Sequence, residues 1–554
     1  MKKFKKTAAA SLALAMSMGL ILSGCGGGDD TGNTANTSND GAVSDPLESV
    51  DDTDGAASAG SVSLPLTEEK ETLTFWTRND VALMNVCGGD LNSTPFFKEL
   101  EERTNVHIEW SVPASGSEQE QFNLLFTSGE LPDIMYNIGY IDGLDAAVDD
   151  GYILDLTPYL EEYAPNYLAA VKNASPDVQK VVKTDSGRYA CIQTIYQTEQ
   201  PPWFGLMIRQ DWLDELGLDI PVTVDEWEET LIAFKEKKGA SAPLSLSSNS
   251  NSILYMGTGL GLYGADMSDG WYQIDNEAKY FFYSDPEAGR ETLTMLNRWY
   301  SKGLIDPDFT TAELFGDSVL VNNGMTGAFS SIYTFPTSLF AAATQDGAKF
   351  TAALPPVRKE GDTMKYRTAN QAFGYSLVIS ADCKNPELAI RWIDYLFSEE
   401  GSLLANYGIE DETFTMVDGK PQFTELMTDN PDGLTFDESL RYYTLAPGFP
   451  SVYSDWSREL NGVPEEYIAM MDVWGIPDAS CRYPDGATMS AEENQEYSNI
   501  FTDLKTYVNE TVLAFITGNK SLDEYDNFIE TIGKYDIGRC MELKQAALDR
   551  YNAR

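Results

Sequence analysis

Histidine is almost missing from this chain, which contains one, His107, in 554 residues. Ser-His and Cys-His chemistry needs an imidazole as general base, so a single histidine leaves little room for it. The sequence also lacks the nucleophile elbow G-x-S-x-G, the zinc motif H-E-x-x-H and the phosphate loop G-x-x-x-x-G-K-[ST]. Triad catalysis is therefore disfavoured, and His107, which stands between apolar neighbours, is interpreted as structural.

Basic residues are few as well. The chain carries 38 lysines and arginines against 87 acidic residues, a formal net charge of −49. A polyanion would be repelled over most of such a surface, so we expect no nucleic-acid partner. The acidity otherwise indicates only good solubility.

Cysteines with diagnostic spacing are absent. The six cysteines, at positions 25, 87, 191, 383, 481 and 540, form no C-x-x-C motif, so neither a zinc site nor a disulfide scaffold is indicated. A single isolated disulfide stays open. The segment Gly259–Gly264 matches the dinucleotide pattern G-x-G-x-x-G but lacks a clear strand-turn-helix frame. We interpret it as a helix end or a packing element, and we expect no cofactor and no metal.

The N-terminus has an apolar run that is short for a membrane span. This run, Thr7 to Leu22, follows four lysines, which is typical of a signal peptide. It ends in Leu22-Ser23-Gly24-Cys25, which resembles the bacterial lipobox; the resemblance implies removal of residues 1–24 and lipidation of Cys25. Two acyl chains would suffice for stable anchoring. The alternative is a secreted protein that is cut elsewhere and keeps a free Cys25.

Large side chains are rare in the stretch that follows. Residues 25–66 contain no lysine or arginine and almost no large apolar residue before Leu64. Such a composition cannot bury enough apolar surface to fold. It predicts a disordered acidic tether between the lipidated cysteine and the globular part.

The rest of the chain is rich enough in apolar residues for real cores, since 42% of the 554 residues are hydrophobic, and it can hold two or three domains. The stretch Glu118–Tyr140 indicates their type. Phe122, Leu125 and Phe126 share one helical stripe, and Gly129 provides the left-handed residue that ends a helix. A helix followed by a sharp stop is therefore predicted.

The apolar run Ile134–Tyr136 follows this helix and predicts a strand buried on both faces. In an open parallel sheet the residues just past such a strand, here Asn137 to Tyr140, line the binding crevice. The remaining pattern alternates strands and helices, as in a parallel α/β sheet. It predicts strands at Leu73–Trp76, Val106–Trp110, Gly187–Ile192 and Phe373–Ile379, and helices at Phe96–Arg103, after the Thr223 capping box and after the Asn385 cap.

Several motifs occur in the order found in family 1 extracellular solute-binding proteins. They are SGELPDI at Ser128–Ile134, GYILDLTP at Gly151–Pro158, RQDWLDELG at Arg209–Gly217 and NPELAIRWIDYLFSEEG at Asn385–Gly401. The chain thus resembles this family, in its large oligosaccharide-binding branch. The resemblance implies a two-lobed α/β fold of the periplasmic-binding-protein-like class (type II). Each lobe would be a mainly parallel sheet flanked by helices, with the ligand cleft between the lobes.

The resemblance also implies an organisation and a set of partners. We expect an N-lobe of residues 67–190 and 372–408 and a C-lobe of residues 191–371 and 409–554, with the first crossing at the Gly187–Ile192 strand. The expected partners are an oligosaccharide and the permease subunits and ATPase of an ABC importer. The protein itself would be a monomer, held by its lipid at the extracellular face of the bacterial cell membrane.

Some relatives, including alginate-binding ones, carry a calcium loop that this chain does not repeat. Lys235–Ser241 stands at the corresponding place and contains three lysines. Calcium needs six to eight oxygen ligands, and lysine side chains supply none. We therefore do not carry that metal site over.

Aromatic and short polar side chains are the candidate ligand contacts, because sugar rings lie on aromatic planes and sugar hydroxyls need polar partners. Tryptophans in apolar strand or helical patterns are assigned to cores: Trp110, Trp212, Trp227, Trp299 and Trp392. Tryptophans in predicted loops, two tyrosines and four polar residues form the candidate site: Trp76, Trp203, Trp271, Trp456, Trp474, Tyr196, Tyr333, Arg78, Asn79, Asn137 and Asn370. Packing within a loop stays an open alternative for each of these aromatic residues.

The function predicted from these features is binding without bond-breaking. We expect a lipid-anchored substrate-binding protein of an ABC importer, which captures an oligosaccharide by hinge closure and is not an enzyme. A lipid-anchored glycoside hydrolase is one alternative, since two of the 87 acidic side chains could stand at catalytic separation. A sugar-binding sensor or adhesion protein without a transporter is another, and the ligand could instead be a peptide.

Overall fold

The computed structural model describes residues 62–140, 143–265, 269–312, 318–332, 347–367, 371–445, 449, 452–461 and 463–554. The chain divides into two units, Met1–Gly55 and Ala56–Arg554, and every described residue belongs to the second. The predicted signal peptide, Cys25, Tyr333 and Asn370 lie outside the described residues, as does the tether as far as residue 61. Across the described ranges, no helix combines the length and the apolar character needed to cross a membrane.

Leu66 corrects the predicted extent of the tether. Its side chain is 5% exposed and packs in the core around the first sheet. Its backbone N–H donates to the Thr104 carbonyl at 3.0 Å. The prediction of a disordered tether as far as residue 66 is therefore wrong at its end, because the apolar side chain finds a core to enter.

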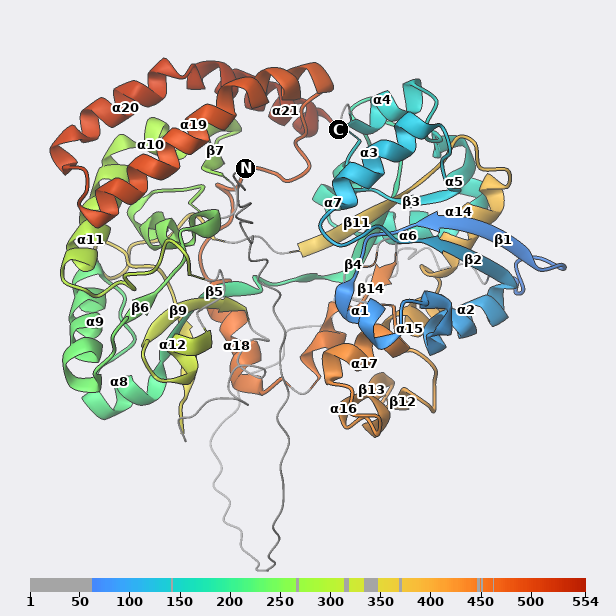
Figure 1. Ribbon diagram of the computed structural model, residues 1–554, viewed down its shortest axis with the longest axis horizontal. Helices are drawn as coiled ribbons and strands as arrows, with labels where there is room; N and C mark the ends of the chain where they lie inside the picture. Colours follow the sequence, from blue (N-terminus) through green and yellow to red (C-terminus); the bar gives the residue numbers. More distant parts are fainter. Residues whose placement is uncertain are drawn as a thin grey trace, which may run out of the picture. The chain divides into compact units, whose positions relative to one another are not determined.

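The first sheet has the strand order β14-β4-β11-β3-β1-β2, and its strands are labelled in Figure 1. They are β1 (Glu71–Trp76), β2 (Val106–Ser111), β3 (Ile134–Tyr136), β4 (Ile192–Gln200), β11 (Gln371–Ile379) and β14 (Tyr453–Ser454). β2 and β3 run parallel to β1, β14 runs parallel to β4, and β11 is antiparallel to both β3 and β4. The predicted strands at 73–76, 106–110, 134–136 and 373–379 are confirmed.

The strand predicted at Gly187–Ile192 is wrong in its position, because β4 begins only at Ile192. Gly187 has a φ of 82°, and its N–H donates to the Thr184 carbonyl at 2.9 Å. The Thr184 N–H donates in turn to the Arg188 carbonyl at 2.9 Å. The first half of the predicted strand is thus part of a closed turn, and its second half is the lead into β4.

Helices and a hairpin pack with the first sheet, and two helix ends predicted from the sequence are confirmed. Gly129 ends α3 with a φ of 71°, while Phe122 and Phe126 are buried and Leu125 is half-buried. The Asn385 side chain accepts from the Leu388 N–H at 3.2 Å and caps α14. The elements are α1 (Val81–Val86), η1 (Leu91–Ser93), α2 (Pro95–Thr104), α3 (Glu118–Ser128), α4 (Gly143–Asp149), α5 (Thr157–Tyr163), α6 (Pro165–Asn173), α7 (Pro176–Val181), α14 (Pro386–Tyr395), α15 (Glu399–Tyr407), β12 (Phe414–Val417), β13 (Lys420–Phe423), α16 (Glu425–Thr428) and α17 (Phe436–Tyr443).

His107 and Trp110 both stand on β2 and have structural surroundings. His107 Nδ1 lies 2.7 Å from Glu101 Oε2 and so ties β2 to α2. The ring of Trp110 lies 4.9 Å from that of Phe75, and its Nε1 donates to Asn92 Oδ1 at 2.9 Å. The other tryptophans assigned to cores are 5% exposed or less, which confirms Trp212, Trp227, Trp299 and Trp392 as core residues.

The second sheet has the order β10-β5-β9-β6, made of β5 (Phe204–Arg209), β6 (Leu244–Ser245), β9 (Ala328–Ile332) and β10 (Phe350–Ala353). β5 is antiparallel to both β9 and β10, and β6 is parallel to β9. The expectation of a mainly parallel sheet therefore does not hold for this half. β5 leads away from the first sheet and β10 leads back towards it, so these two neighbours run in opposite directions.

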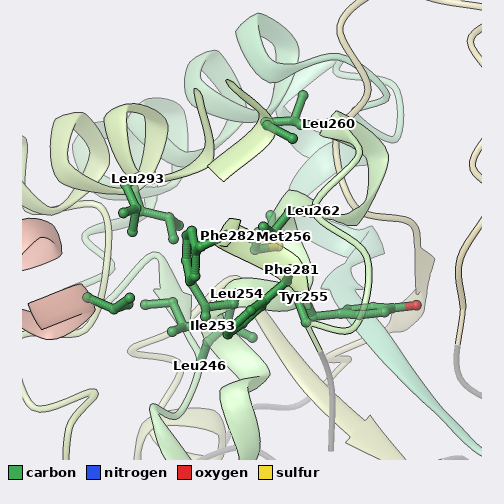
Figure 2. Packing of buried hydrophobic residues seen from close by; sticks show 14 of the residues in the cluster. Leu246, Ile253, Leu254, Tyr255, Met256, Leu260, Leu262, Phe281, Phe282 and Leu293 are labelled. Atoms are coloured by element: carbon green, nitrogen blue, oxygen red, sulfur yellow. The ribbon is translucent and has the colours of Figure 1, made fainter. Parts of the chain in front are cut away.

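The elements around the second sheet bury a large apolar cluster, part of which appears in Figure 2. There Phe281 and Phe282 lie among Ile253, Leu254 and Met256. The elements are α8 (Gln210–Leu216), α9 (Val224–Lys238), η2 (Asn249–Leu260), β7 (Trp271–Ile274), β8 (Glu277–Tyr280), α10 (Phe281–Ser284), α11 (Pro286–Ser301), α12 (Ser318–Asn322), α18 (Glu465–Trp474), α19 (Ala491–Thr517), η4 (Leu522–Glu524), α20 (Tyr525–Lys534) and α21 (Ile537–Ala553). The short helix η3 (Trp456–Leu460) contacts β4 of the first sheet instead. The predicted capping box of α9 is confirmed at Thr223 and Glu226.

The G-x-G-x-x-G segment is a helix end that needs its glycines for packing. η2 ends at Leu260, and Gly261 caps it with a φ of 93°. A Cβ at Gly259 would lie 2.2 Å from the Pro356 carbonyl oxygen, and one at Gly264 would lie 2.7 Å from Gly270 backbone atoms. Close backbone approach accounts for this motif.

The chain passes between the two sheets at 201–203, between β10 and β11, and between β14 and α18. β4 and β14 both belong to the first sheet, and α17 packs on α1 and α2. The lobe boundaries stay a proposal. On these pairings we propose the first crossing near residue 201 in place of 190, and the third near residue 460 in place of 408, since residues 409–454 pack with the first core.

Candidate functional site

The candidate site lies where strands of the first sheet end. Arg78 follows β1 and Asn137 follows β3, which are parallel neighbours. β11 runs antiparallel to β3 with Leu377 opposite Tyr136, so it brings Tyr375 to the same edge. Parallel strands place their carboxyl ends at one edge of a sheet, which is where open α/β folds bind ligands.

A cluster of one arginine and two tyrosines occupies this edge. The Arg78 guanidinium carbon lies 5.1 Å from the centre of the Tyr375 ring and 5.8 Å from that of Tyr136. The two tyrosine rings are 5.4 Å apart and inclined at 40°. Burial raises the pKa of Tyr136, and the positive charge of Arg78 opposes this shift. Tyr136 is 2% exposed whereas Tyr375 is 48% exposed, so Tyr375 is the member of the cluster that offers a ring to a ligand.

Asn137 has its amide fixed on both sides. Its Nδ2 donates to Ser376 Oγ at 3.0 Å, and its Oδ1 accepts from the Gly139 N–H at 3.1 Å. It also borders a groove of about 750 Å³, whose lining includes Cys191 and residues 485–486 and 488–492. The sequence placed Asn137 at this edge, and the hydrogen bonds show that its amide also shapes the turn after β3.

Tyr196 extends the edge onto β4, where it is half-buried. Burial and the nearby Glu459 carboxylate raise the pKa of its hydroxyl to about 12, against the opposing positive charge of Arg458. These interactions place the Tyr196 ring next to η3. On the same strand, Thr198 Oγ1 accepts from Nε1 of the half-buried Trp456 at 3.0 Å.

Arg458, the neighbour of Glu459 in η3, is buried and joins η3 to α15. Its side chain is 3% exposed, and its Nη1 donates to the Ala405 carbonyl at 3.3 Å and to Asn406 Oδ1 at 3.2 Å. Its Nε is buried and has no hydrogen-bond partner among the described residues. The guanidinium is therefore a positive group held by Ala405 and Asn406, close enough to Tyr196 to lower the pKa of its hydroxyl.

Trp203 lies in the crossing segment between β4 and β5. It is half-buried and packs against the small apolar cluster that contains Met207, Phe329 and Trp474. The segment is not helical, as its two prolines predict, and Trp203 stands at the junction of the two sheets. It keeps its place as a candidate ligand contact.

Three of the predicted loop tryptophans are core residues. Trp76 is the last residue of β1 and is 2% exposed, with its ring 5.3 Å from that of Phe122. Trp271 opens β7, is 2% exposed, and donates from Nε1 to the Tyr497 hydroxyl at 2.8 Å. For both, the predicted loop position is wrong, because Trp76 ends a strand and packs against Phe122, and Trp271 packs among Tyr280, Tyr497 and Phe501.

Trp474 and Asn79 also have structural roles. Trp474 ends α18, is 1% exposed, and donates from Nε1 to the Leu206 carbonyl at 3.0 Å, so its prediction as a loop contact is wrong as well. The Asn79 Nδ2 donates to the Pro113 carbonyl at 2.9 Å. Its Oδ1 is buried and has no hydrogen-bond partner in the described part of the chain. Asn79 thus anchors the loop after β1.

Sequence reasoning predicted Trp456 of η3 but missed Tyr375, Arg458 and Glu459. Tyr375 lies in a correctly predicted strand, and its place two residues before the buried Leu377 could have marked it as an edge residue. Glu459 and Arg458 reach Tyr196 from a distant part of the chain, and no local pattern indicates this. No group of three or more His, Cys, Asp or Glu side chains suited to holding a metal ion occurs in the described ranges.

Residues 92–402 match the family of bacterial extracellular solute-binding proteins. The chain belongs to this family. The family predicted from the ordered motifs is thereby confirmed. The two-lobed α/β class predicted for this solute-binding protein is confirmed as well, by the structures of similar fold.

This solute-binding protein is similar in sequence to two curated relatives and in fold to a solved structure. The fructooligosaccharide ABC transporter substrate-binding protein FusA of Streptococcus pneumoniae serotype 4 is 24% identical over 522 residues, 89% of this chain and 92% of FusA. Lipoprotein LipO of Bacillus subtilis is 24% identical over 366 residues, 64% of this chain and 70% of LipO. The structure of S. pneumoniae FusA with kestose has a TM-score of 0.68 at 20% identity, covering 87% of this chain and 99% of FusA.

Proposed function

We propose that this solute-binding protein captures an oligosaccharide at the edge of the first sheet and delivers it to the permease of an ABC importer. The observation that carries the proposal is the half-exposed Tyr375 ring, supported by Arg78 and flanked by polar groups, at the ligand-binding edge of this fold. Tyr196, Trp203 and Trp456 add half-buried aromatic surface near that edge. Aromatic planes with polar neighbours suit the C–H faces and hydroxyls of sugars.

The relatives favour an oligosaccharide over a peptide. The relative that covers most of this chain is named for fructooligosaccharide and for an ABC transporter, and its structure holds kestose. We extend the transporter, with its permease subunits and ATPase, to this chain by that similarity. Capture by closure of two lobes on one monomer completes the proposal. Tyr333 and Asn370, which lie outside the described residues, stay predicted contacts.

The test is calorimetric titration of the full-length chain carrying Cys25→Ala with 1-kestose, nystose, maltotriose and fructose. We expect saturable binding of at least one trisaccharide or tetrasaccharide, and recovery of the sugar unchanged. Release of smaller sugars would favour the glycoside hydrolase instead. Binding of a peptide library but of no sugar would overturn the carbohydrate assignment. Normal sugar uptake in cells that lack the protein would favour the sensor or adhesion function.

We also propose that the protein is anchored to the membrane through Cys25. The lipobox-like sequence supports this, as does the name of the similar lipoprotein LipO. Replacement of Cys25 by alanine should move the protein from the membrane fraction to the medium, because two acyl chains supply the anchoring free energy. A variant that stays in the membrane fraction would contradict the anchor, and a Cys87→Ala variant provides the matched control.

A further inference from the structure

The structure connects the two cores at a place other than the crossing segments. α21 belongs to the core around the second sheet, where Leu548 and Tyr551 are buried. α7 and the turn after it belong to the core around the first sheet, through Val178 and Val182. Both helices are labelled in Figure 1. The end of α21 contacts this turn through several charged groups.

Asp185 is the centre of this contact. Arg550 Nε donates to its Oδ2 at 2.9 Å, and Arg554 Nε donates to its Oδ1 at 3.0 Å. Arg554 Nη2 also donates to Oδ1, and its Nη1 donates to the Lys183 carbonyl at 3.1 Å. A carboxylate that accepts from two guanidinium groups makes hydrogen bonds of the strong, charge-assisted kind.

Burial distinguishes the contact from an ordinary surface ion pair. The Arg554 side chain is 9% exposed, and that of Asp185 is 26% exposed. The Tyr551 hydroxyl, on a residue 3% exposed, donates to Asp177 Oδ1 at 2.7 Å. Gly486 fits between the two sides, since a Cβ there would lie 2.5 Å from Val181 and 2.8 Å from Tyr551. Exposed ion pairs contribute little, whereas partly buried ones of fixed geometry contribute measurably.

Arg550 is held in place on its own side. Its Nη1 and Nη2 donate to Glu493 at 2.9 Å and 2.5 Å, and Nη2 also donates to the Thr488 carbonyl at 3.1 Å. The guanidinium is therefore oriented by the second core before it meets Asp185. A preorganised donor loses less freedom when the contact forms.

We propose that Asp177, Asp185, Arg550, Tyr551 and Arg554 form a C-terminal clamp that sets the equilibrium between two relative placements of the cores. The clamp stabilises the placement seen here, and its opening permits the other. The clamp rests on the proposed function in one respect: it matters for ligand capture only if the lobes move about a hinge. It deepens that function by naming a contact that controls how readily the lobes move.

The test measures the placement of the cores without any ligand. Spin labels are placed at Lys172→Cys on α6 and Asn499→Cys on α19, which are both exposed positions. The distance between the labels, measured by double electron–electron resonance, reports the distance between the cores. The full-length chain carries Cys25→Ser, and the cysteines of the described residues are buried and stay unlabelled. The variants are Asp185→Asn in one core, Arg554→Gln in the other, and the two combined.

We expect each single variant to add a second distance population, changing the ratio of the two placements on the order of tenfold, as loss of charge-assisted hydrogen bonds does. The double variant should change the ratio by less than the two single changes combined, because both variants remove the pair between Asp185 and Arg554. The matched control is Glu496→Gln, which breaks the pair between Arg539 and Glu496 within the second core, at 2.7 Å, and should leave the distances as in the parent.

Parent-like distances in both single variants would overturn the clamp, and so would additive changes in the double variant. Sugar binding is measured separately by titration. A protein that binds no sugar but shows the predicted distances would refute the proposed function and keep the clamp. Normal sugar binding with unchanged distances would refute the clamp and keep the proposed function.

Discussion

At the edge of the first sheet, some residues support the site from within and others are exposed to a ligand. Tyr136 is buried and Arg78 is half-buried, and both rest against the exposed ring of Tyr375. The sequence predicted Arg78 and Asn137 from their places after strands, since the end of a strand is a local feature. It chose Trp271 and Trp474 wrongly, because whether a tryptophan is covered depends on distant partners such as Tyr497 and Leu206.

Tyr375→Ala should weaken sugar binding by about 2 kcal/mol or more, because it removes the exposed stacking plane while leaving the fold intact. Titration with the sugar that the parent binds measures the loss. Tyr375→Phe keeps the ring and should stay close to the parent. Equal affinity of Tyr375→Ala and the parent would exclude this ring from the site.

Asp394 should make stability depend on pH in the acid range. It is 3% exposed, accepts from the Tyr167 N–H and from Asn166 Nδ2, both at 2.8 Å, and burial raises its pKa to about 6 although these hydrogen bonds lower it. The folded state thus keeps the proton to a higher pH than the unfolded state, whose carboxyl titrates near 4. Stability therefore falls by about 2 kcal/mol as pH rises from roughly 4 to 6.

Replacing Asp394 by asparagine removes this titration. The difference in unfolding free energy between parent and Asp394→Asn, measured by denaturant titration from pH 4 to 7, should change by that amount in the variant's favour as pH rises. Asp503→Asn, at an exposed position on α19, is the matched control for the loss of one carboxylate. Parallel curves for Asp394→Asn and the parent would show that the carboxyl titrates alike in both states.

Single elements were predictable where their signals are local. Gly129 ended α3, and Asn385 capped α14, because caps act within one turn of chain. β4 was misplaced because the turn closed by Thr184 and Gly187 interrupts an apolar pattern that reads as a strand. The three-residue connection between β4 and β5 carries the chain between sheets, and no sequence pattern states which sheet a strand joins.

Gly259→Ala should destabilise the second core by about 1–3 kcal/mol, because the new Cβ would meet the Pro356 carbonyl at 2.2 Å and force the end of η2 to move. Thermal unfolding measures the loss. Gly538→Ala in α21 is the matched control: its Cβ meets nothing within 4 Å, and alanine favours a helix by up to about 1 kcal/mol. If the Gly259→Ala protein were as stable as the parent, close packing would not explain this glycine, and other roles such as ligand binding would have to be considered.

The molecule has two large cores, which are joined by the crossing segments and by the contact between α21 and the turn after α7. The core around the first sheet and the core around the second share no member, although residues far apart in sequence build each of them. The family motifs predicted this division correctly as a class, whereas the positions of the crossings depend on strand pairing. Two cores that share no member are free to unfold separately.

Calorimetry should therefore resolve two unfolding transitions, each of which responds to changes in its own core. Leu296→Ala in α11 and Leu377→Ala in β11 are matched, since both side chains are 0% exposed, one in each core. Each should lower one transition by the equivalent of about 2–5 kcal/mol, the cost of truncating a buried leucine, and leave the other nearly in place. If both variants shifted a single transition equally, the cores would form one cooperative unit. In that case the relative motion of the lobes would have to come from bending within the crossing segments without any independent loosening of either core.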